Sequence, residues 1–432
     1  MANQPKRELR WLKLDNAAKI YPAARRQNWT NIFRMSVTLT EAVDTQILQS
    51  ALDATVPRFP SMAARLCRGL FWYYLEQVEH APRIQQDYSY PVSRMSSEDL
   101  GRCALRVMVY GNRIAVEMFH SLTDGSGALI FLKTLTAEYL RRKYGIAIPC
   151  EQGVMDLSEA PKPQELEDSF PKYAGNLSAS RKENNSWRLT GTPEEDGFRH
   201  VTCLEVPVQA ALDKAHEYGV TLTAFLASAM LAALQDLQAE RIPEVHRRPP
   251  IRVLVPVNLR FLFPSQTLRN FAMYSTPEIL PRLGRYSFPE ICQEVTHRMG
   301  VENTAKQMSM KIATNVASEK LMAVKIMPLF IKNAVMKAIF NAVGEKKSCL
   351  SLSNLGRVQV PDAMAPYIQR FDFILGIQAT APYNCGVLSW GDTLYINFIR
   401  DTKEPALERC FHCVLRDMGL PVQVRSNNRQ EA

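Results

Sequence analysis

The residues best suited to chemistry lie in one short stretch, His120-Ser121-Leu122-Thr123-Asp124-Gly125. A histidine side chain can accept and return a proton near neutral pH, so His120 is a candidate general base. Glycines at 125 and 127 allow close approach of the backbone, and a helix starting here would offer unpaired N–H groups to an anionic or thioester group. A simpler interpretation also fits: a structural histidine at a strand end, followed by a helix cap at Asp124 or Ser126.

The sequence before the histidine predicts a β-hairpin. Apolar residues alternate over 105–109 and again over 114–118, and Gly111-Asn112 between them favours a tight turn. Continuing the period of two places His120 on the same inward face as Met118. Beyond Gly127 the apolar spacing becomes helical. We therefore expect His120 at the end of a strand and just before a helix N-terminus.

The remaining elements predict an α/β (α+β) protein of two domains, in line with a length of 432 residues. We place the first domain at 1–175, a linker rich in proline and polar residues at 176–199, and the second domain at 200–432. Strands are expected at 32–39, 71–75, 201–206, 251–257, 349–353, 371–378, 387–390 and 394–399, and helices at 45–56, 210–218, 223–240, 287–310, 321–343 and 404–418.

Composition narrows the class of protein. Hydrophobic residues make up 46% and charged residues 22%, which is typical of a globular protein. The net charge of +9 favours an anionic partner, such as nucleic acid, anionic lipid or a phosphorylated ligand, although an ordinary basic surface fits equally. Nine scattered cysteines and the absence of a signal-like N-terminus or an 18-residue apolar run predict a cytoplasmic protein with reduced thiols.

The stretch from His120 to Gly125 resembles the HxxxDG motif of the chloramphenicol-acetyltransferase-like superfamily. That superfamily includes condensation domains, alcohol O-acetyltransferases, plant BAHD acyltransferases and polyketide-associated acyltransferases. Further landmarks are Pro256-Val257-Asn258-Leu259-Arg260, Asn270-Phe271 and Ser353-Asn354-Leu355-Gly356. The resemblance implies two similar domains, each a mixed, mostly antiparallel sheet with helices, flanking a central tunnel.

The resemblance also implies roles for individual residues. His120 would act as general base without an acyl-enzyme, and Asp124 would pair with Arg260 to hold the loop that includes Gly125. Ser353 and Asn354 are candidate contacts for the substrate or oxyanion, although a strand-ending turn explains them as well. The donor would be acyl-CoA or the acyl-phosphopantetheine arm of a carrier protein, with no bound cofactor, no metal and no nucleic acid.

Departures from the subfamilies favour an O-acyltransferase acting on a small-molecule alcohol. Phe119 stands where many condensation domains have a second histidine, and the BAHD DFGWG motif is absent. The alternatives are an amide-forming enzyme with an amine acceptor, or a non-catalytic carrier- or lipid-binding protein with a vestigial site. The intact motif argues against the last of these.

Two further segments contain residues that could have a function, and a structural role explains each of them. Cys410-Phe411-His412-Cys413 lies inside an expected helix and is interpreted as two ordinary thiols. Residues 321–347 combine apolar side chains with lysines, which is compatible with peripheral membrane contact. A helix packed on the second domain is the interpretation we favour for this segment.

Overall fold

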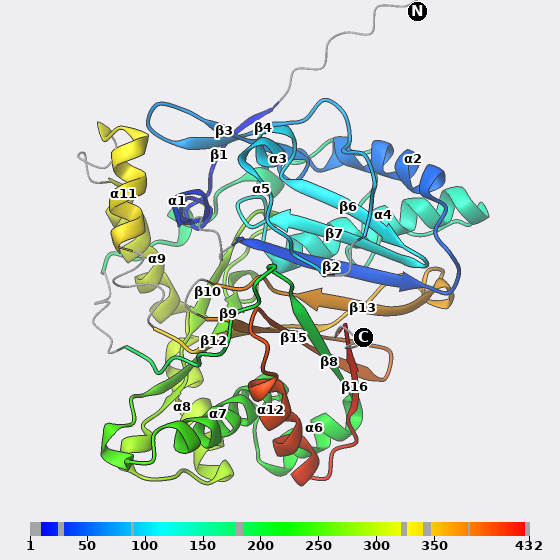
Figure 1. The fold of residues 1–432 in the computed structure, drawn as a ribbon. Helices are drawn as coiled ribbons and strands as arrows, with labels where there is room; N and C mark the ends of the chain where they lie inside the picture. Colours follow the sequence, from blue (N-terminus) through cyan, green and yellow to red (C-terminus); the bar gives the residue numbers. More distant parts are fainter. Residues whose placement is uncertain are drawn as a thin grey trace, which may run out of the picture.

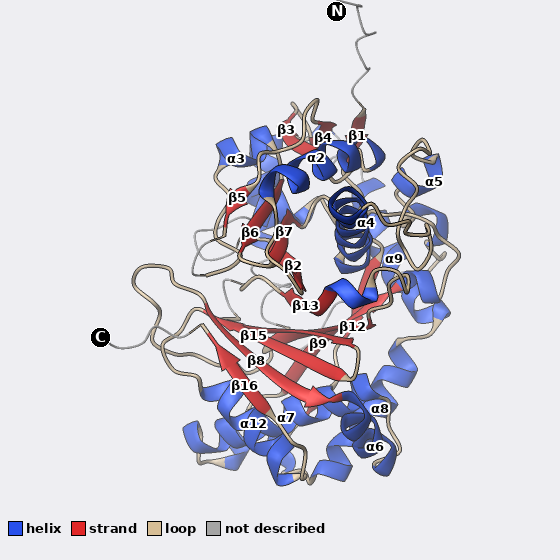
Figure 2. Cartoon of the chain, turned by 90° about the vertical axis from the view of Figure 1, so that its right-hand side faces the viewer, coloured by secondary structure: helices blue, strands red, loops and turns tan. Residues whose placement is uncertain are grey.

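The computed structural model describes residues 10–24, 30–87, 90–177, 185–320, 326–339, 347–378 and 381–427. Two lobes form the body of the molecule, each a β-sheet with helices, and a small three-stranded sheet, β1-β4-β3, lies on the outer side of the first lobe (Figures 1 and 2). The predicted α/β (α+β) fold, with two lobes that each combine a sheet and helices, is confirmed.

The first lobe is built on a five-stranded sheet in the order β13-β2-β7-β6-β5. The predicted hairpin is present as β6 (Leu105–Tyr110) and β7 (Arg113–Phe119), and β7 lies between β6 and β2 (Ile32–Leu39). Helices α2 (Thr45–Thr55) and α4 (Gly125–Tyr144) pack on each other, and α4 packs on β2 and β7 of this sheet. The other elements of the first lobe are β1 (Trp11–Lys13), α1 (Ile20–Ala24), β3 (Ala64–Arg68), β4 (Tyr73–Gln77), β5 (Gln85–Gln86), α3 (Ser97–Arg102) and α5 (Pro163–Leu166).

One edge strand of the first sheet comes from the second half of the chain. β13 (Ile368–Ile374) pairs antiparallel with β2, from Ile368 opposite Leu39 to Ile374 opposite Arg34. This strand falls inside the range 200–432 that we assigned to the second domain. Alternating apolar residues indicate a strand but do not say which sheet it joins, so a boundary at residue 200 divides a hydrogen-bonded sheet.

The second lobe has an eight-stranded sheet with the main order β10-β9-β12-β14-β15-β8-β16, and β11 also pairs with β9. β12 runs parallel to both β9 and β14, and the other pairs are antiparallel. The elements of this lobe are β8 (His200–Pro207), α6 (Val208–Glu217), α7 (Leu222–Arg241), β9 (Ile251–Asn258), β10 (Ala272–Ser275), β11 (Glu278–Ile279), α8 (Phe288–Glu302), α9 (Ala305–Lys320), β12 (Leu350–Arg357), β14 (Tyr383–Trp390), β15 (Thr393–Arg400), α12 (Ala406–Asp417) and β16 (Gln423–Ser426). Helices α6, α7, α8 and α12 cover the face of this sheet that is turned away from the first lobe (Figure 2). Helix α11 (Leu329–Ile339) lies between α9 and β12 in the sequence but packs on α1 of the first lobe.

Helix α7 is long and apolar enough to cross a membrane, but 72% of its apolar window is buried. It packs against α8, α12 and β9, so we interpret it as the central core helix of the second lobe. This agrees with the helix predicted at 223–240.

Three sequence predictions are corrected. The helix expected at 287–310 is two helices, because Asn303 ends α8 and the Thr304 hydroxyl accepts the Gln307 N–H at the start of α9. Phe71 belongs to the turn between β3 and β4 rather than to a strand, which begins at Tyr73. Within 321–347 we expect a helix packed on the second domain, but the described helix, α11, packs against α1 of the first lobe. Residues 321–325 and 340–346 lie outside the described residues.

Candidate active site

The backbone of His120 extends the pairing of β2 and β7 by one residue. Its N–H donates to the carbonyl of Asn31 at 2.8 Å, directly after the Ile32–Phe119 pair. The imidazole ring stacks on Tyr21 of α1, with centroids 4.5 Å apart and planes 17° from parallel, and Phe33 lies at 5.0 Å on a tilted plane. Strand and aromatic neighbours together restrict how this ring can turn.

Asn270 sets the tautomer of His120. The Asn270 Nδ2 group donates to the His120 carbonyl at 3.0 Å and to Asp15 Oδ2 at 3.2 Å. Both partners are acceptors, so the amide nitrogen must face them and Oδ1 must face the imidazole Nδ1, 3.1 Å away. Nδ1 therefore holds the proton and donates it to Oδ1, which leaves the lone pair on Nε2 available as a base.

Burial lowers the pKa of His120 below its ordinary value, because desolvation penalises the imidazolium. The negative charges of Asp124 and Asp15 and the bond to Asn270 act in the opposite direction but are smaller. At neutral pH the ring is therefore uncharged, which is the state that a general base requires.

The Asp124 carboxylate accepts hydrogen bonds from three donors. Its Oδ2 accepts from Arg260 Nη1 at 2.8 Å and from the Phe271 N–H at 2.9 Å, and its Oδ1 accepts the Gly127 N–H at 3.1 Å. Arg260 is itself fixed by donating to the carbonyls of Thr267 and Arg269. The carboxylate thus caps α4 and ties it to the second lobe, which is a bracing geometry.

Gly125 lies where the ends of two second-lobe strands reach α4. A Cβ at this position would come within 2.9 Å of Leu355 Cδ2, so a larger residue would push against β12. At the next residue, the Ser126 hydroxyl accepts from Asn258 Nδ2 at 3.0 Å, at the end of β9. Both lobes therefore contribute to the surroundings of the helix N-terminus.

The two candidate oxyanion contacts differ in what they bind. Asn354 donates from Nδ2 to the Thr223 hydroxyl at 3.0 Å, and its Oδ1 accepts the Gly356 N–H at 2.9 Å, so its amide serves a turn. Ser353 is nearly buried on β12, and within the described residues its hydroxyl has no hydrogen-bond partner. Ser353 is thus the better placed of the two to donate to a ligand.

Three residues around His120 were not identified as site residues from the sequence: Asp15, Tyr21 and Asn31. Asn270 was noted only as part of a landmark. Asp15 lies 105 residues before His120 and is fully buried, and burial raises its pKa while Arg269 opposes the rise. No local spacing signals such a contact, because it forms only when the N-terminal segment reaches the second lobe.

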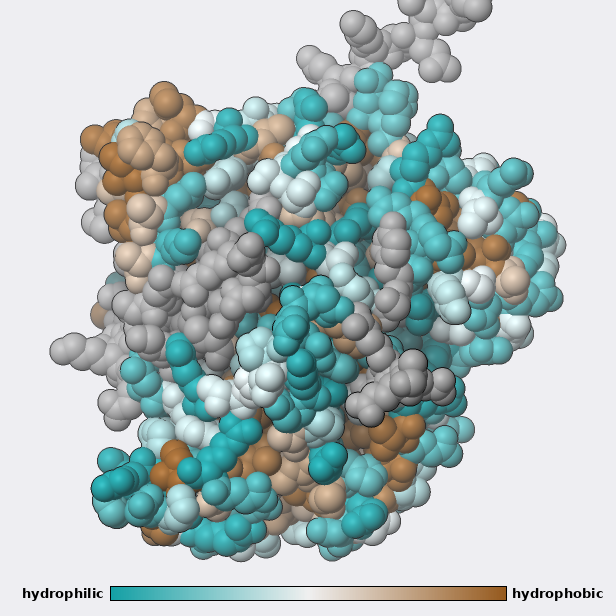
Figure 3. Space-filling model, viewed as in Figure 1, coloured by the Kyte–Doolittle hydropathy of each residue, from teal (hydrophilic) through white to brown (hydrophobic). Residues whose placement is uncertain are grey.

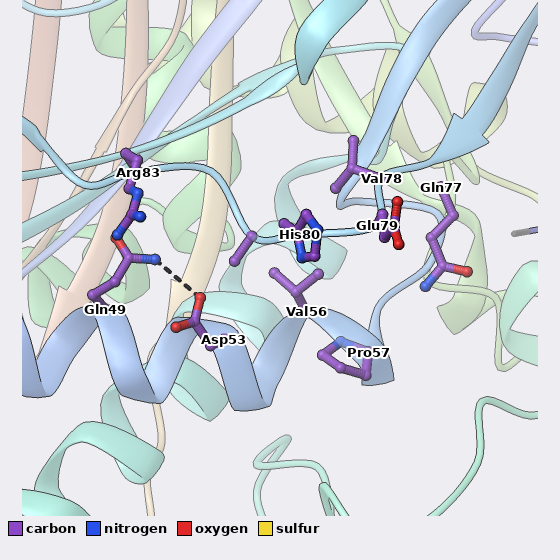
Figure 4. Close-up of a pocket in the computed structure, with 10 residues that line it drawn as sticks. Gln49, Asp53, Val56, Pro57, Gln77, Val78, Glu79, His80 and Arg83 are labelled. Carbon is purple, nitrogen blue, oxygen red and sulfur yellow. Dashed lines mark hydrogen bonds between the residues drawn. The ribbon is translucent and has the colours of Figure 1, made fainter. Parts of the chain in front are cut away.

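A pocket on the first lobe lies away from His120. Its volume is about 480 Å³, and it is lined by α2 and the segment after β4, including Gln49, Asp53, His80 and Arg83 (Figure 4). Among the described residues, no candidate site residue lines this pocket. Six of its ten lining residues are polar or charged, and the oriented imidazole of His120 lies outside it, so the candidate site is the one at His120.

No protein-family model and no curated protein matches the sequence. Solved structures match over nearly the whole chain. They include TRI3, a trichothecene 15-O-acetyltransferase from Fusarium sporotrichioides (10% identity, 97% and 96% of the two chains, TM-score 0.61), and F. graminearum TRI101 complexed with coenzyme A and deoxynivalenol (10%, 97% and 100%, 0.63). The first condensation domain of the calcium-dependent antibiotic synthetase, with a substrate analogue, is similar at 12% identity (94% and 96%, 0.63).

The chain has the fold of condensation domains and acetyltransferases. At these identities the similarity concerns the fold, and it agrees with the fold that the HxxxDG resemblance implied. In this condensation-type fold, the strand end with His120 and the strand ends of the second lobe meet at the N-terminus of α4.

Proposed function

We propose that this protein is an acyltransferase that moves an acyl group from a thioester to an alcohol, with His120 as general base. One observation carries the proposal: Nδ1 of His120 is bound to an amide oxygen whose orientation is fixed, so Nε2 is the free base. The lowered pKa keeps that nitrogen unprotonated at neutral pH.

The chemistry needs no covalent acyl-enzyme. Nε2 takes the hydroxyl proton while the acceptor oxygen attacks the thioester carbonyl and forms a tetrahedral oxyanion. The oxyanion then collapses, the C–S bond breaks, and the imidazolium returns its proton to the leaving thiolate. A donor near the oxyanion would supply part of the rate, and the Ser353 hydroxyl is our candidate.

The donor we propose is acyl-CoA or an acyl-phosphopantetheine arm on a carrier protein, entering a tunnel between the lobes opposite the acceptor. The matched structures support both possibilities, because one contains coenzyme A and another is a condensation domain. The positive charge of the chain suits a phosphorylated donor.

An amide-forming reaction is the second candidate, because a condensation domain matches this fold as well as the acetyltransferases do. Thiol release from a panel of acyl-CoA donors, measured with alcohols and with amines, separates the two. We expect release that depends on an alcohol, with ester as product. Release only with amines would show that the acceptor class is wrong, and release without any acceptor would indicate thioester hydrolysis.

A further inference from the structure

An apolar surface on the first lobe is unusual for a protein in water. Helix α11 exposes Phe330, Ile331 and Val335, and the turn between β3 and β4 exposes Leu70 (73%) and Phe71. Figure 3 shows a brown area at the upper left, where Figure 1 places α11. We call these five side chains the apolar face.

Helix α11 exposes most of its apolar residues to solvent, whereas an ordinary surface helix turns them toward the core. Exposed positions 330, 331, 334, 335 and 338 follow helical spacing along one side and are all apolar. On the opposite side, Leu329 and Lys332 are buried against the protein. A contiguous exposed apolar patch of this kind usually marks a contact surface.

The helix and the turn are held together as one unit. The Leu329 N–H donates to the Leu70 carbonyl at 3.0 Å. The Lys332 amine donates to the Phe71 carbonyl at 2.8 Å and lies 3.2 Å from the centroid of the Trp72 ring. The apolar face is therefore preformed and would need little ordering upon binding.

Charge around the apolar face favours an anionic partner. Neither 326–339 nor 68–74 contains an acidic residue, while Arg68 and Lys337 are exposed beside the apolar side chains. A second copy of the chain on this face would bring the same cations together, which is unfavourable. An anionic lipid surface would accept both the apolar side chains and the cations.

The apolar face is also close to the candidate active site. α11 packs on α1, and Tyr21 of α1 stacks on His120. The short helix α1 therefore lies between α11, which carries most of the apolar face, and the imidazole ring of His120.

We propose that the apolar face docks on an anionic lipid bilayer. Phe330, Ile331 and Leu70 enter the boundary between headgroups and acyl chains, and Arg68 and Lys337 contact lipid phosphates. The bilayer then supplies a long-chain donor or acceptor to the site. This last step rests on the proposed acyl transfer, whereas docking does not.

The test is co-sedimentation of the full-length protein with vesicles of phosphatidylcholine alone or mixed with phosphatidylglycerol. We expect binding to the anionic vesicles that weakens as salt rises. Leu70→Asp should reduce it by about ten-fold, from the loss of one inserted side chain. Lys337→Glu, which replaces a positive charge by a negative one, should reduce it by about five-fold or more.

Matched controls lie on the second lobe. Leu283 is 71% exposed, almost the same fraction as Leu70, and Arg282 beside it is also exposed. Leu283→Asp and Arg282→Glu should bind vesicles as the wild type does. The proposal is overturned if wild type binds neither vesicle, or if Leu70→Asp and Leu283→Asp bind equally.

Two further measurements separate the alternatives. A dimer in analytical ultracentrifugation that Leu70→Asp dissociates would make the face a self-association surface and overturn the proposal. His120→Ala should bind vesicles normally. If wild type binds vesicles and transfers no acyl group to any acceptor, docking stands and the proposed function fails. If anionic vesicles accelerate long-chain acyl transfer by wild type but not by Leu70→Asp, delivery from the bilayer is supported.

Discussion

At the scale of single residues, the site depends on polar contacts that fix one imidazole ring. Asn270 can hold Nδ1 of His120 only while its own amide is oriented, and the acceptors that orient it are the His120 carbonyl and Asp15. Asp15 touches no reacting atom in the proposed mechanism, so it is a positioning residue.

This contact predicts a difference between two variants of Asp15. Asp15→Asn keeps an oxygen that can accept from Asn270 Nδ2, whereas Asp15→Leu leaves that N–H buried without a partner. We expect Asp15→Leu to lower kcat by about ten-fold with KM nearly unchanged, and Asp15→Asn to restore most of it. Steady-state kinetics on variants with matched unfolding curves measures this, and equal kcat values would contradict the role of Asp15.

The lowered pKa of His120 predicts the pH dependence. The neutral ring is active, so kcat/KM should be constant at neutral pH and fall as pH decreases through the pKa of His120. Because burial lowers that pKa, the fall should lie below the ordinary value of 6.5. A pH profile of thiol release tests this, and an acidic limb centred above 6.5 would contradict the effect of burial.

At the scale of elements, close backbone contact joins β13 to the second sheet. A Cβ on Gly386 of β14 would lie 2.3 Å from the Phe373 carbonyl oxygen, which is backbone and cannot turn aside. Gly300, in α8, has open space around the same position.

These two glycines give a matched pair. Gly386→Ala should lower the free energy of unfolding by about 1–3 kcal/mol because the strands must move apart. Gly300→Ala should leave it unchanged or raise it by up to about 1 kcal/mol, since alanine favours a helix. Urea unfolding measures both, and a neutral Gly386→Ala would mean that the two strands are not in close contact.

The sequence predicted those elements whose pattern is local. The hairpin around 111–112 and helix α7 follow from apolar periodicity, and the position of His120 directly after the second hairpin strand follows from counting along β7. The sheet that β13 joins, the break at Asn303 and the place of α11 depend on contacts between distant segments. For the same reason the sequence indicated His120 and Asp124 but not Asp15.

At the scale of the whole molecule, the lobes share a hydrophobic core. Phe33 and Met35 of β2 belong to the same buried cluster as Phe373 of β13 and Ile399 of β15. Without the C-terminal half of the chain, the first lobe would therefore lack the edge strand β13 and part of its hydrophobic core.

This sharing predicts that residues 1–175 alone do not fold stably. The fragment would expose the β2 edge that β13 covers, and exposed edges promote aggregation. We expect an aggregated or unfolded fragment by circular dichroism and size-exclusion chromatography, while the full chain unfolds cooperatively. A monomeric, cooperatively folding fragment would instead support the domain boundary predicted near residue 175.

The most direct test of acyl transfer by a histidine base compares two histidine variants. His120→Ala removes the proposed base, and His80→Ala alters an exposed histidine in the remote pocket. Thiol release from acyl-CoA with an alcohol acceptor should fall by about 10²–10⁴-fold in His120→Ala and stay at the wild-type rate in His80→Ala. Equal rates for wild type and His120→Ala across the donor panel would contradict the account.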